Sequence, residues 1–345
     1  MEPTIELAGH KVGIENPPVI FAEIGINHEG DLGVAMDMAT AAIRAGATFI
    51  KHQTHIPKAE MSREAQDTIP GNSDVSIFEV MVRCALSEAE EVQLAEHVRN
   101  QGAVFFSTPF SREAVERLEK LEVPFYKIGS GECNNYPFVD FVASTGKPIV
   151  LSTGMNSISN VAKSVEILEK RGVEYALLHT TNLYPTPSEL LRLGGLEELR
   201  ESFPVPVGLS DHSISNAACL GAVALGASIL ERHFVDSKDR PGPDVICSMD
   251  PIELEQLISW SNQLFLARGG KKSLAPQEQV TADFAFASVA TITDVQAGQE
   301  LTEENCFPVR PGTGFYGPSD YLSLLGRRAK VFIPARTQMS PEMLA

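Results

Sequence analysis

The sequence predicts an α/β protein: a (β/α)8 barrel followed by a small β-rich domain. Eight short apolar runs alternate with amphipathic helical patterns, which is the element order of proteins built on a parallel sheet. Polar residues follow these runs repeatedly, and active sites of such barrels lie at the carboxyl ends of the strands. The chain has 345 residues, which fits a barrel of roughly 250 residues with one appended domain.

Strands are expected where Val, Ile, Leu and Phe form continuous runs, because parallel strands are buried on both faces. The expected strands span residues 19–25, 48–54, 103–108, 124–130, 148–153, 175–180, 206–210 and 228–233. The polar residues at or near their ends are Glu23, Lys51, Gln53, Ser107, Thr108, Lys127, Ser152, Asn182, Ser210, His212, Glu231 and His233. Together these groups suit an anionic substrate, a metal ion and a carbonyl group.

Helical patterns with recognisable ends lie between the strands. The segment 31–45 stops at Gly46, a residue type favoured just after a helix. The segment 87–101 begins with a serine and acidic residues, which suit an N-terminal cap and first turn. Further helices are expected over residues 111–121, 157–171, 215–225 and 251–267.

The connection over residues 55–86 is unusually long, and long connections in compact domains commonly form lids or binding loops. In the tail, residues 297–306 and 335–344 share a pattern of residue types, which favours a small domain built from two similar units. The expected boundaries are 1–268 for the barrel, 269–283 for a linker and 284–345 for the small domain.

The composition excludes several classes of protein. A net charge of −17 argues against binding to nucleic acid or to an anionic membrane surface. The five cysteines form no C-x-x-C pair, which favours reduced thiols in a cytoplasmic enzyme. The first ten residues lack the apolar stretch of a signal peptide, and no run of about 20 apolar residues could span a bilayer.

Two histidines and two lysines are the strongest candidates for chemistry. His212 and His233 follow neighbouring strands and could bind a divalent metal with an incomplete protein shell, although a lone histidine is more often structural. Lys51 and Lys127 lie in apolar runs, where an unpaired cation is costly. They could clamp a phosphate or carboxylate, or one could form a Schiff base.

Carboxylates and turns near the strand ends add further candidates. Glu23 and Glu132 could act as acid or base, or simply pair with a lysine. The glycine-rich turn 129–132, which contains Ser130, could present N–H groups to an anion. The proline-rich loop with Asn182 and Tyr184 and the turn ending in Asp244 also face the expected site, or they merely stiffen the chain.

These residues, in this order, resemble the sialic acid synthase family, and most of all its bacterial N-acetylneuraminate synthases of the capsule-forming type. The matching strings are FAEIGINHEGDL, KHQTHI, STPFSREA, YKIGSGECNNYP, LSTGMNSI, TTNLYPTP, GLSDHS, ILERHF and RPGPDVICSM, followed by AFASVA and VRPGTG in the tail. The resemblance implies a TIM barrel with a small antifreeze-like (SAF) domain. It also implies a domain-swapped homodimer in which each small domain covers the partner's barrel mouth.

The resemblance implies a reaction as well: a metal-dependent condensation of phosphoenolpyruvate with N-acetylmannosamine that gives N-acetylneuraminate and phosphate by C–O cleavage. The implied metal is Mn2+, with Mg2+ or Co2+ as alternatives. Positions implied to hold phosphoenolpyruvate are Lys51, Gln53, Thr108, Lys127, Ser130, Ser152, Asn182 and Ser210; those implied to bind the sugar are Glu23, Tyr184, Asp244, Phe286 and Arg310. His212 and His233 match the metal ligands, and Glu132 matches a carboxylate between the substrates.

Three alternatives remain at this stage. One is a synthase of the same mechanism that uses another sugar, such as the legionaminic acid precursor. Another is a class I aldolase using Lys127, which borohydride trapping with pyruvate would reveal. A carbohydrate- or ice-binding module is suggested only by the tail and leaves the strand-end residues unexplained.

Overall fold

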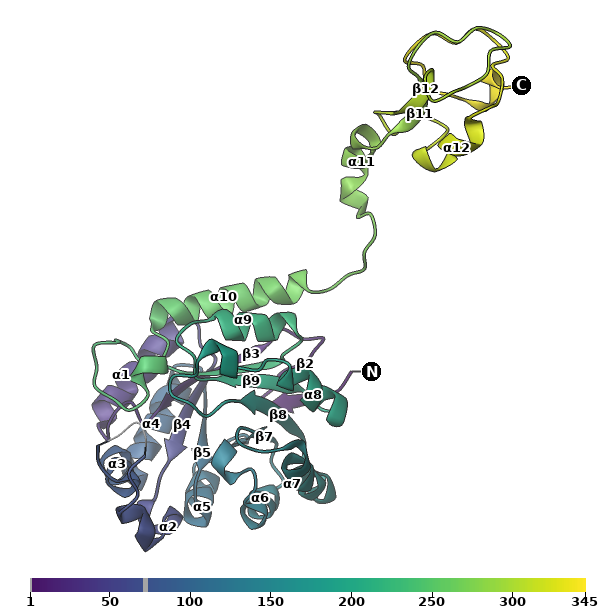
Figure 1. The fold of residues 1–345 in the computed structure, drawn as a ribbon. Coiled ribbons are helices and arrows are strands. Elements are labelled where there is room, and N and C mark those ends of the chain that lie inside the picture. Colours follow the sequence, from purple (N-terminus) through teal and green to yellow (C-terminus); the bar gives the residue numbers. More distant parts are fainter. Residues whose placement is uncertain (1, 71–73) are drawn as a thin grey trace. The chain divides into compact units, whose positions relative to one another are not determined.

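The computed structural model describes residues 2–70 and 74–345. The chain divides into two compact units, Met1–Gly269 and Gly270–Ala345, which are described separately (Figure 1). None of the helices in the described residues combines the length and the apolar composition that a bilayer span requires.

The first unit is a parallel barrel, which confirms the predicted fold class (Figure 1). Its hydrogen-bonded strand order is β5-β4-β3-β10-β9-β8-β7-β6, and β5 also lies against β6, which closes the barrel. The strands are β3 Val19–Gly25, β4 Phe49–Thr54, β5 Val104–Pro109, β6 Tyr126–Ile128, β7 Ile149–Ser152, β8 Tyr175–Thr180, β9 Val207–Asp211 and β10 Ile229–His233. β6 is shorter than expected because the chain turns at Gly129 into a 3-10 helix.

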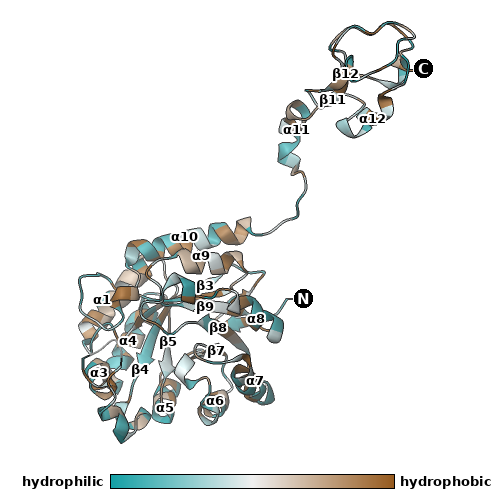
Figure 2. Ribbon diagram, viewed as in Figure 1, coloured by the Kyte–Doolittle hydropathy of each residue, from teal (hydrophilic) through white to brown (hydrophobic). Residues whose placement is uncertain are grey.

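Several helices of this unit begin at the expected caps. The Asp31 side chain accepts from Val34 N, and Ser87 and Asp250 form capping boxes, so side-chain oxygens satisfy N–H groups that lack an intrahelical partner. The helices are α1 Leu32–Arg44, α2 Pro57–Glu60, α3 Ile77–Cys84, α4 Glu88–Asn100, α5 Arg112–Lys120, α6 Tyr136–Ala143, α7 Ile158–Arg171, α8 Gly195–Ser202, α9 Ala217–Ala224 and α10 Pro251–Ala267. Hydrophobic and hydrophilic residues alternate along α10, as on a half-buried helix (Figure 2).

Helices α6 and α8 and the first two strands of the chain were not predicted from the sequence. Helices α6 and α8 are short, and neither has a side-chain cap at its start, so the usual signals are weak. The antiparallel hairpin of β1 Thr4–Leu7 and β2 His10–Gly13 was also not expected. Its apolar residues pack with the phenylalanines inside the barrel, near the amino ends of the strands.

The long connection after β4 contains α2 and α3, and residues 71–73 of this connection lie outside the described residues. Val80, Met81 and Cys84 on α3 pack against Ile26, which follows β3. The connection therefore places an apolar surface beside the carboxyl ends of the strands.

The second unit begins with α11 Gln279–Ala285, which overlaps the end of the segment expected to be a linker. β11 Ser288–Thr291 pairs antiparallel with β12 Cys306–Val309, and α12 Tyr321–Leu324 follows. The two similar segments have matching turns: Gly298 and Arg336 occupy equivalent places and have positive φ values of 79° and 62°. A β-bridge joins Val295 to Ile333, just before these turns.

Candidate active site

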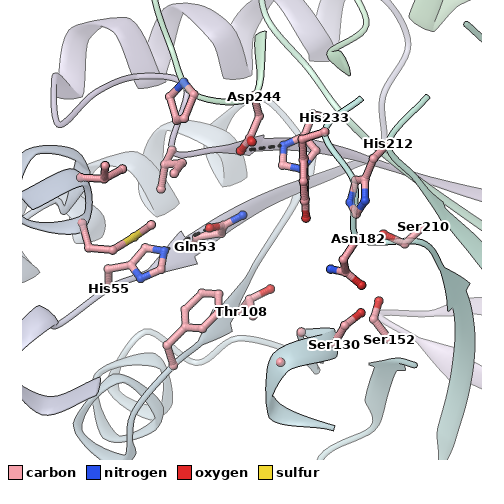
Figure 3. A pocket seen from close by; sticks show the side chains of 18 of the residues that line it. Gln53, His55, Thr108, Ser130, Ser152, Asn182, Ser210, His212, His233 and Asp244 are labelled. Atoms are coloured by element: carbon pink, nitrogen blue, oxygen red, sulfur yellow. Dashed lines mark hydrogen bonds and ion pairs between the residues drawn. The ribbon is translucent and has the colours of Figure 1, made fainter. Parts of the chain in front are cut away.

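A cavity of about 510 Å³ opens where the barrel strands end (Figure 3). It brings together side chains that are far apart in the sequence, as expected for the carboxyl face of a barrel. The residues predicted from the sequence that line it are Lys51, Gln53, Thr108, Lys127, Ser130, Ser152, Asn182, Tyr184, Ser210, His212, His233 and Asp244.

Two buried lysines form one end of the cavity. Lys51 Nζ donates to Thr108 Oγ1 at 3.2 Å, and Lys127 Nζ donates to Ser152 Oγ at 2.7 Å. Lys51 and Lys127 are 3 % and 2 % exposed. Two cations beside hydroxyl groups form a site suited to a small polyanion.

Carboxylates balance the charge of these lysines. Lys51 Nζ contacts a carboxylate oxygen of Glu23 and lies 3.4 Å from Glu231 Oε1, while Lys127 Nζ lies 3.6 Å from the same Glu231 oxygen. Burial lowers the pKa of Lys51 to about 8, an effect that Glu231 opposes and Lys127 reinforces. Burial also lowers the pKa of Lys127. Burial disfavours the anion of Glu231, but Lys127 and Lys51 hold its pKa below the usual range.

Several buried polar atoms at the cavity have no hydrogen-bond partner within the described part of the chain. They are Thr180 Oγ1, Asn182 Oδ1, Glu231 Oε2 and His233 Nδ1. Buried polar groups are nearly always satisfied in folded proteins. Their presence together at one cavity indicates that a bound polar ligand completes the site.

Ser130 is placed by close backbone packing. Its hydroxyl accepts from Gly154 N at 3.1 Å, and its carbonyl accepts from Asn156 Nδ2 at 3.1 Å. A Cβ atom on Gly154 would collide with Asn182 Oδ1. Glycine at this position therefore allows the loops after β6, β7 and β8 to meet.

His212 and His233 face each other with ring centroids 5.5 Å apart (Figure 3). His212 Nδ1 lies 2.9 Å from the Thr181 carbonyl, so this nitrogen carries the proton and Nε2 is free to accept a ligand. His233 Nδ1 lies 3.6 Å from Asp244 Oδ2. Burial lowers the pKa of His212 to about 4 and that of His233 to about 3, which keeps both imidazoles neutral.

This donor set fits a divalent ion whose shell is completed by substrate or water. Neutral imidazoles and a nearby carboxylate are ordinary ligands for Mn2+ or a similar ion. Burial raises the pKa of Asp244 to about 6, and a cation would favour its charged form. No group of three or more His, Cys, Asp or Glu side chains in residues 2–70 and 74–345 is already arranged around one metal position.

Two cavity residues were given no role from the sequence. Glu231 lies between the lysines and links them electrostatically. His55 stacks on Phe110 with centroids 4.3 Å apart and lies with Nε2 3.0 Å from Gln53 Oε1. Glu231 was already among the polar residues expected at strand ends, and strand alternation could have given it a role, because residues two apart share a face and His233 was a candidate.

Glu23 is buried against Lys51, whereas three other predicted residues lie elsewhere. Glu132 lines a neighbouring groove and accepts from Asn135 Nδ2 at 2.6 Å, and burial raises its pKa. Phe286 and Arg310 belong to the second unit, where the Phe286 side chain is 60 % exposed. Their reach to a partner's barrel stays a prediction.

Fold and site together define a class: a barrel whose cavity, at the carboxyl ends of the strands, gathers cations and imidazoles that suit a small anionic substrate and a metal ion. A model of the NeuB family matches residues 38–273, and the chain belongs to this family. It is therefore a phosphoenolpyruvate-dependent nonulosonic acid synthase.

Three relatives illustrate the range of this family. The chain is 33% identical to N,N'-diacetyllegionaminic acid synthase of Campylobacter jejuni, covering 90% of this chain and 95% of the relative. It is 32% identical to mouse N-acetylneuraminate-9-phosphate synthase, with coverage of 94% and 92%. A crystal structure of N-acetylneuraminic acid synthetase from Leptospira borgpetersenii shares 29% identity at a TM-score of 0.75, covering 81% of this chain and 95% of that one.

Proposed function

We propose that the enzyme condenses phosphoenolpyruvate with N-acetylmannosamine to give N-acetylneuraminate and phosphate. The observation that carries this proposal is the arrangement of the cavity, with Lys51 and Lys127 near one another and His212, His233 and Asp244 close to Tyr184. A polyanion and a neutral carbonyl compound can therefore bind side by side in one cavity.

The lysine end is proposed to hold phosphoenolpyruvate. Its phosphate and carboxylate would receive charge-assisted hydrogen bonds from Lys51 and Lys127, with hydroxyls of Thr108 and Ser152 already bonded to those lysines. Gln53, Ser130, Asn182 and Ser210 complete the proposed set. A water molecule bound beside the substrate could donate to the unpartnered Asn182 Oδ1.

The other end is proposed to hold the open-chain sugar. His212 and His233 would bind the divalent ion, Mn2+ or alternatively Mg2+ or Co2+, which when bound supplies Lewis acidity toward the aldehyde oxygen. Tyr184 stacks on His212 with centroids 4.2 Å apart, so it fixes that ring and forms a wall for the sugar. Glu23 and Asp244 are proposed to bind sugar hydroxyls, with Phe286 and Arg310 contributed by the partner of a homodimer.

The chemistry then follows from the substrates. Carbon 3 of phosphoenolpyruvate attacks the aldehyde carbon, positive charge develops at carbon 2, and water adds there. The tetrahedral product loses phosphate by C–O cleavage. Glu132 is proposed to accept a proton from this water; burial raises its pKa, which brings it closer to the range useful for proton transfer.

The mouth of the cavity favours an unphosphorylated sugar. Ile77, Val80 and Met81 line it. Arg83 is the cation on this helix, and it already pairs with Glu29 at 3.3 Å with its side chain 51 % exposed. A sugar phosphate would meet apolar side chains and an arginine that is already paired with Glu29, whereas an uncharged sugar needs no cation at this surface.

The same apolar wall supports a second candidate, a 2,4-diacetamido-2,4,6-trideoxy sugar of the legionaminic type, whose methyl groups suit such a surface. The test incubates chelator-stripped enzyme with phosphoenolpyruvate, Mn2+ and each sugar, and follows phosphate and product mass. Release of phosphate with N-acetylmannosamine alone supports the first candidate. Release of phosphate with the trideoxy sugar alone supports the second candidate. If neither sugar leads to phosphate release and borohydride traps pyruvate on Lys127, the proposal is wrong and the enzyme is an aldolase.

A further inference from the structure

A chain of buried hydrogen bonds formed by His28, His52 and Glu91 runs behind the cavity wall, and none of these three residues lines the cavity. On β4, Lys51 and Gln53 line the cavity, and His52 between them points the other way because strand residues alternate. His52 Nδ1 lies 3.1 Å from Glu91 Oε1 on α4, and His52 Nε2 lies 3.3 Å from His28 Nε2. His28 and His52 are each 1 % exposed.

The backbone amide of Gly30 determines which ring nitrogen of His28, and then of His52, carries the proton. Gly30 N donates to His28 Nδ1 at 3.1 Å, and an amide N–H cannot accept. His28 must therefore carry its proton on Nε2 and donate to His52 Nε2. His52 then carries its proton on Nδ1 and donates to Glu91. Burial, reinforced by His52, lowers the pKa of His28 to about 3, so this ring stays neutral at working pH.

The far end of the chain is anchored in two helices. Glu91 is fully buried and also accepts from Thr54 Oγ1 and, at 3.3 Å, from Arg117 NH1 on α5. Burial opposes its ionisation, yet the hydrogen bond and charge of His52 and the other donors hold its pKa below the usual range. A buried carboxylate with several donors is a fixed acceptor, because any displacement would leave its charge unpaired.

The near end of the chain holds a turn at the cavity. His28 is preceded by Asn27, whose Oδ1 accepts from Asp244 N at 3.1 Å and whose Nδ2 donates to Ser248 Oγ at 2.9 Å. Ser248 Oγ in turn donates to the Asp244 carbonyl at 2.8 Å. The turn after β3 therefore fixes the backbone on both sides of a residue that lines the cavity.

We propose that His28 and His52 are positioning residues for the sugar end of the active site. The hydrogen bonds of His28 and His52 connect the turn after β3 to strand β4 and to Glu91. Asn27, next to His28 in this turn, holds the backbone of Asp244 in place. This inference rests on the proposed function only for the identity of the sugar. The placement of Asp244 by this chain does not depend on it.

Two substitutions at one position separate the two nitrogens of His28. His28→Asn keeps an acceptor near the Nδ1 position for Gly30 but lacks the donor to His52; His28→Gln keeps a donor near the Nε2 position. We expect His28→Asn to raise KM for the sugar about tenfold, the usual effect of one lost buried hydrogen bond. KM for phosphoenolpyruvate should stay within about twofold, and His28→Gln should restore most of the sugar affinity.

His52→Asn, which keeps the donor to Glu91 and loses the acceptor for His28, should match His28→Asn. The double variant should add nothing further, because both remove the same bond. His97→Asn is the matched control. His97 lies on α4, the helix that carries Glu91, but bonds Thr40. The KM values of this variant should not change. Equal rises in both KM values, or additive effects in the double variant, would overturn the proposal.

Hydrogen–deuterium exchange tests the placement without any sugar. In His28→Asn, amides of residues 25–31 and 242–249 should exchange faster than in the unaltered enzyme, while thermal unfolding shows that the fold is kept. If the unaltered enzyme turns over neither sugar yet this exchange pattern appears, the proposed substrate fails and the positioning role stands. Unchanged exchange in both segments would refute the positioning role.

Discussion

Lys51 on β4 and Glu231 on β10 approach to 3.4 Å across the cavity, and the same Glu231 oxygen lies 3.6 Å from Lys127. One carboxylate therefore lies close to two buried cations, and Glu23 adds a second carboxylate beside Lys51. The charge of Glu231 raises the pKa of both lysines and so opposes the effect of burial, which lowers it.

The first prediction concerns pH. Because the pKa of Lys51 is lowered to about 8, its cation is present below pH 8 and is lost as the pH rises through this value. We expect kcat/KM for phosphoenolpyruvate to fall about tenfold per pH unit above the pKa, since this ratio reports the free enzyme. A profile that stays flat to pH 9.5 would show that Lys51 does not control binding.

The second prediction is that Glu231→Gln moves this alkaline limb to lower pH. Glu231 raises the pKa of Lys51, so removal of its charge lets burial and Lys127 lower that pKa further. The measurement is the same profile for the variant, with the exposed Glu113→Gln on α5 as the control that leaves the limb in place. A shift toward higher pH would contradict the charge balance described above.

The third prediction concerns the metal. His233→Ala should reduce metal-dependent turnover by at least about 100-fold while the protein stays folded, because Lewis-acid stabilisation is worth several kcal/mol. Mn2+ should raise the melting temperature of the stripped enzyme but not of the variant, since a ligand stabilises the state that binds it. Full activity of the unaltered enzyme in the presence of a chelator would show that the proposed metal site is wrong.

The fourth prediction concerns Glu132. If this carboxylate accepts a proton during water addition, Glu132→Gln should lower kcat about 100-fold, within the range for lost general-base catalysis. KM for each substrate should change little, since the amide keeps the size of the side chain. Near-normal turnover of this variant would show that Glu132 takes no part in the reaction and only bonds Asn135 in its groove.

The fifth prediction concerns stability. Arg232 is 1 % exposed and donates to Asn216 Oδ1 and the Ser213 carbonyl, with Asp211 3.4 Å away. Arg232→Ala should lower the free energy of unfolding by about 3–5 kcal/mol, because it strands a buried carboxylate.

The matched control is Arg240→Ala, which breaks a partly exposed pair with Asp236 and should cost less than about 1 kcal/mol. Urea unfolding of both variants measures the difference. Equal losses would mean that burial of the Arg232 pair adds nothing to stability.

The barrel and much of the cavity were predictable because their signals are local. Apolar runs and capping residues such as Ser87 and Asp250 mark elements wherever they occur in the chain. The polar residues at strand ends, His233 among them, then meet because a closed barrel brings all its carboxyl ends to one face. The short helices α6 and α8 were missed because their starts carry no side-chain cap.

The order of residues was enough to predict most of the chemical groups around the cavity and that a barrel gathers them. Their pairing became visible in the folded chain: Glu231 lies between Lys51 and Lys127, and His52 points away from the cavity to bond His28 and Glu91. These pairings join residues from different strands and helices. Local propensity says nothing about them, because hydrogen bonds and ion pairs depend on distances that exist only once the chain has folded.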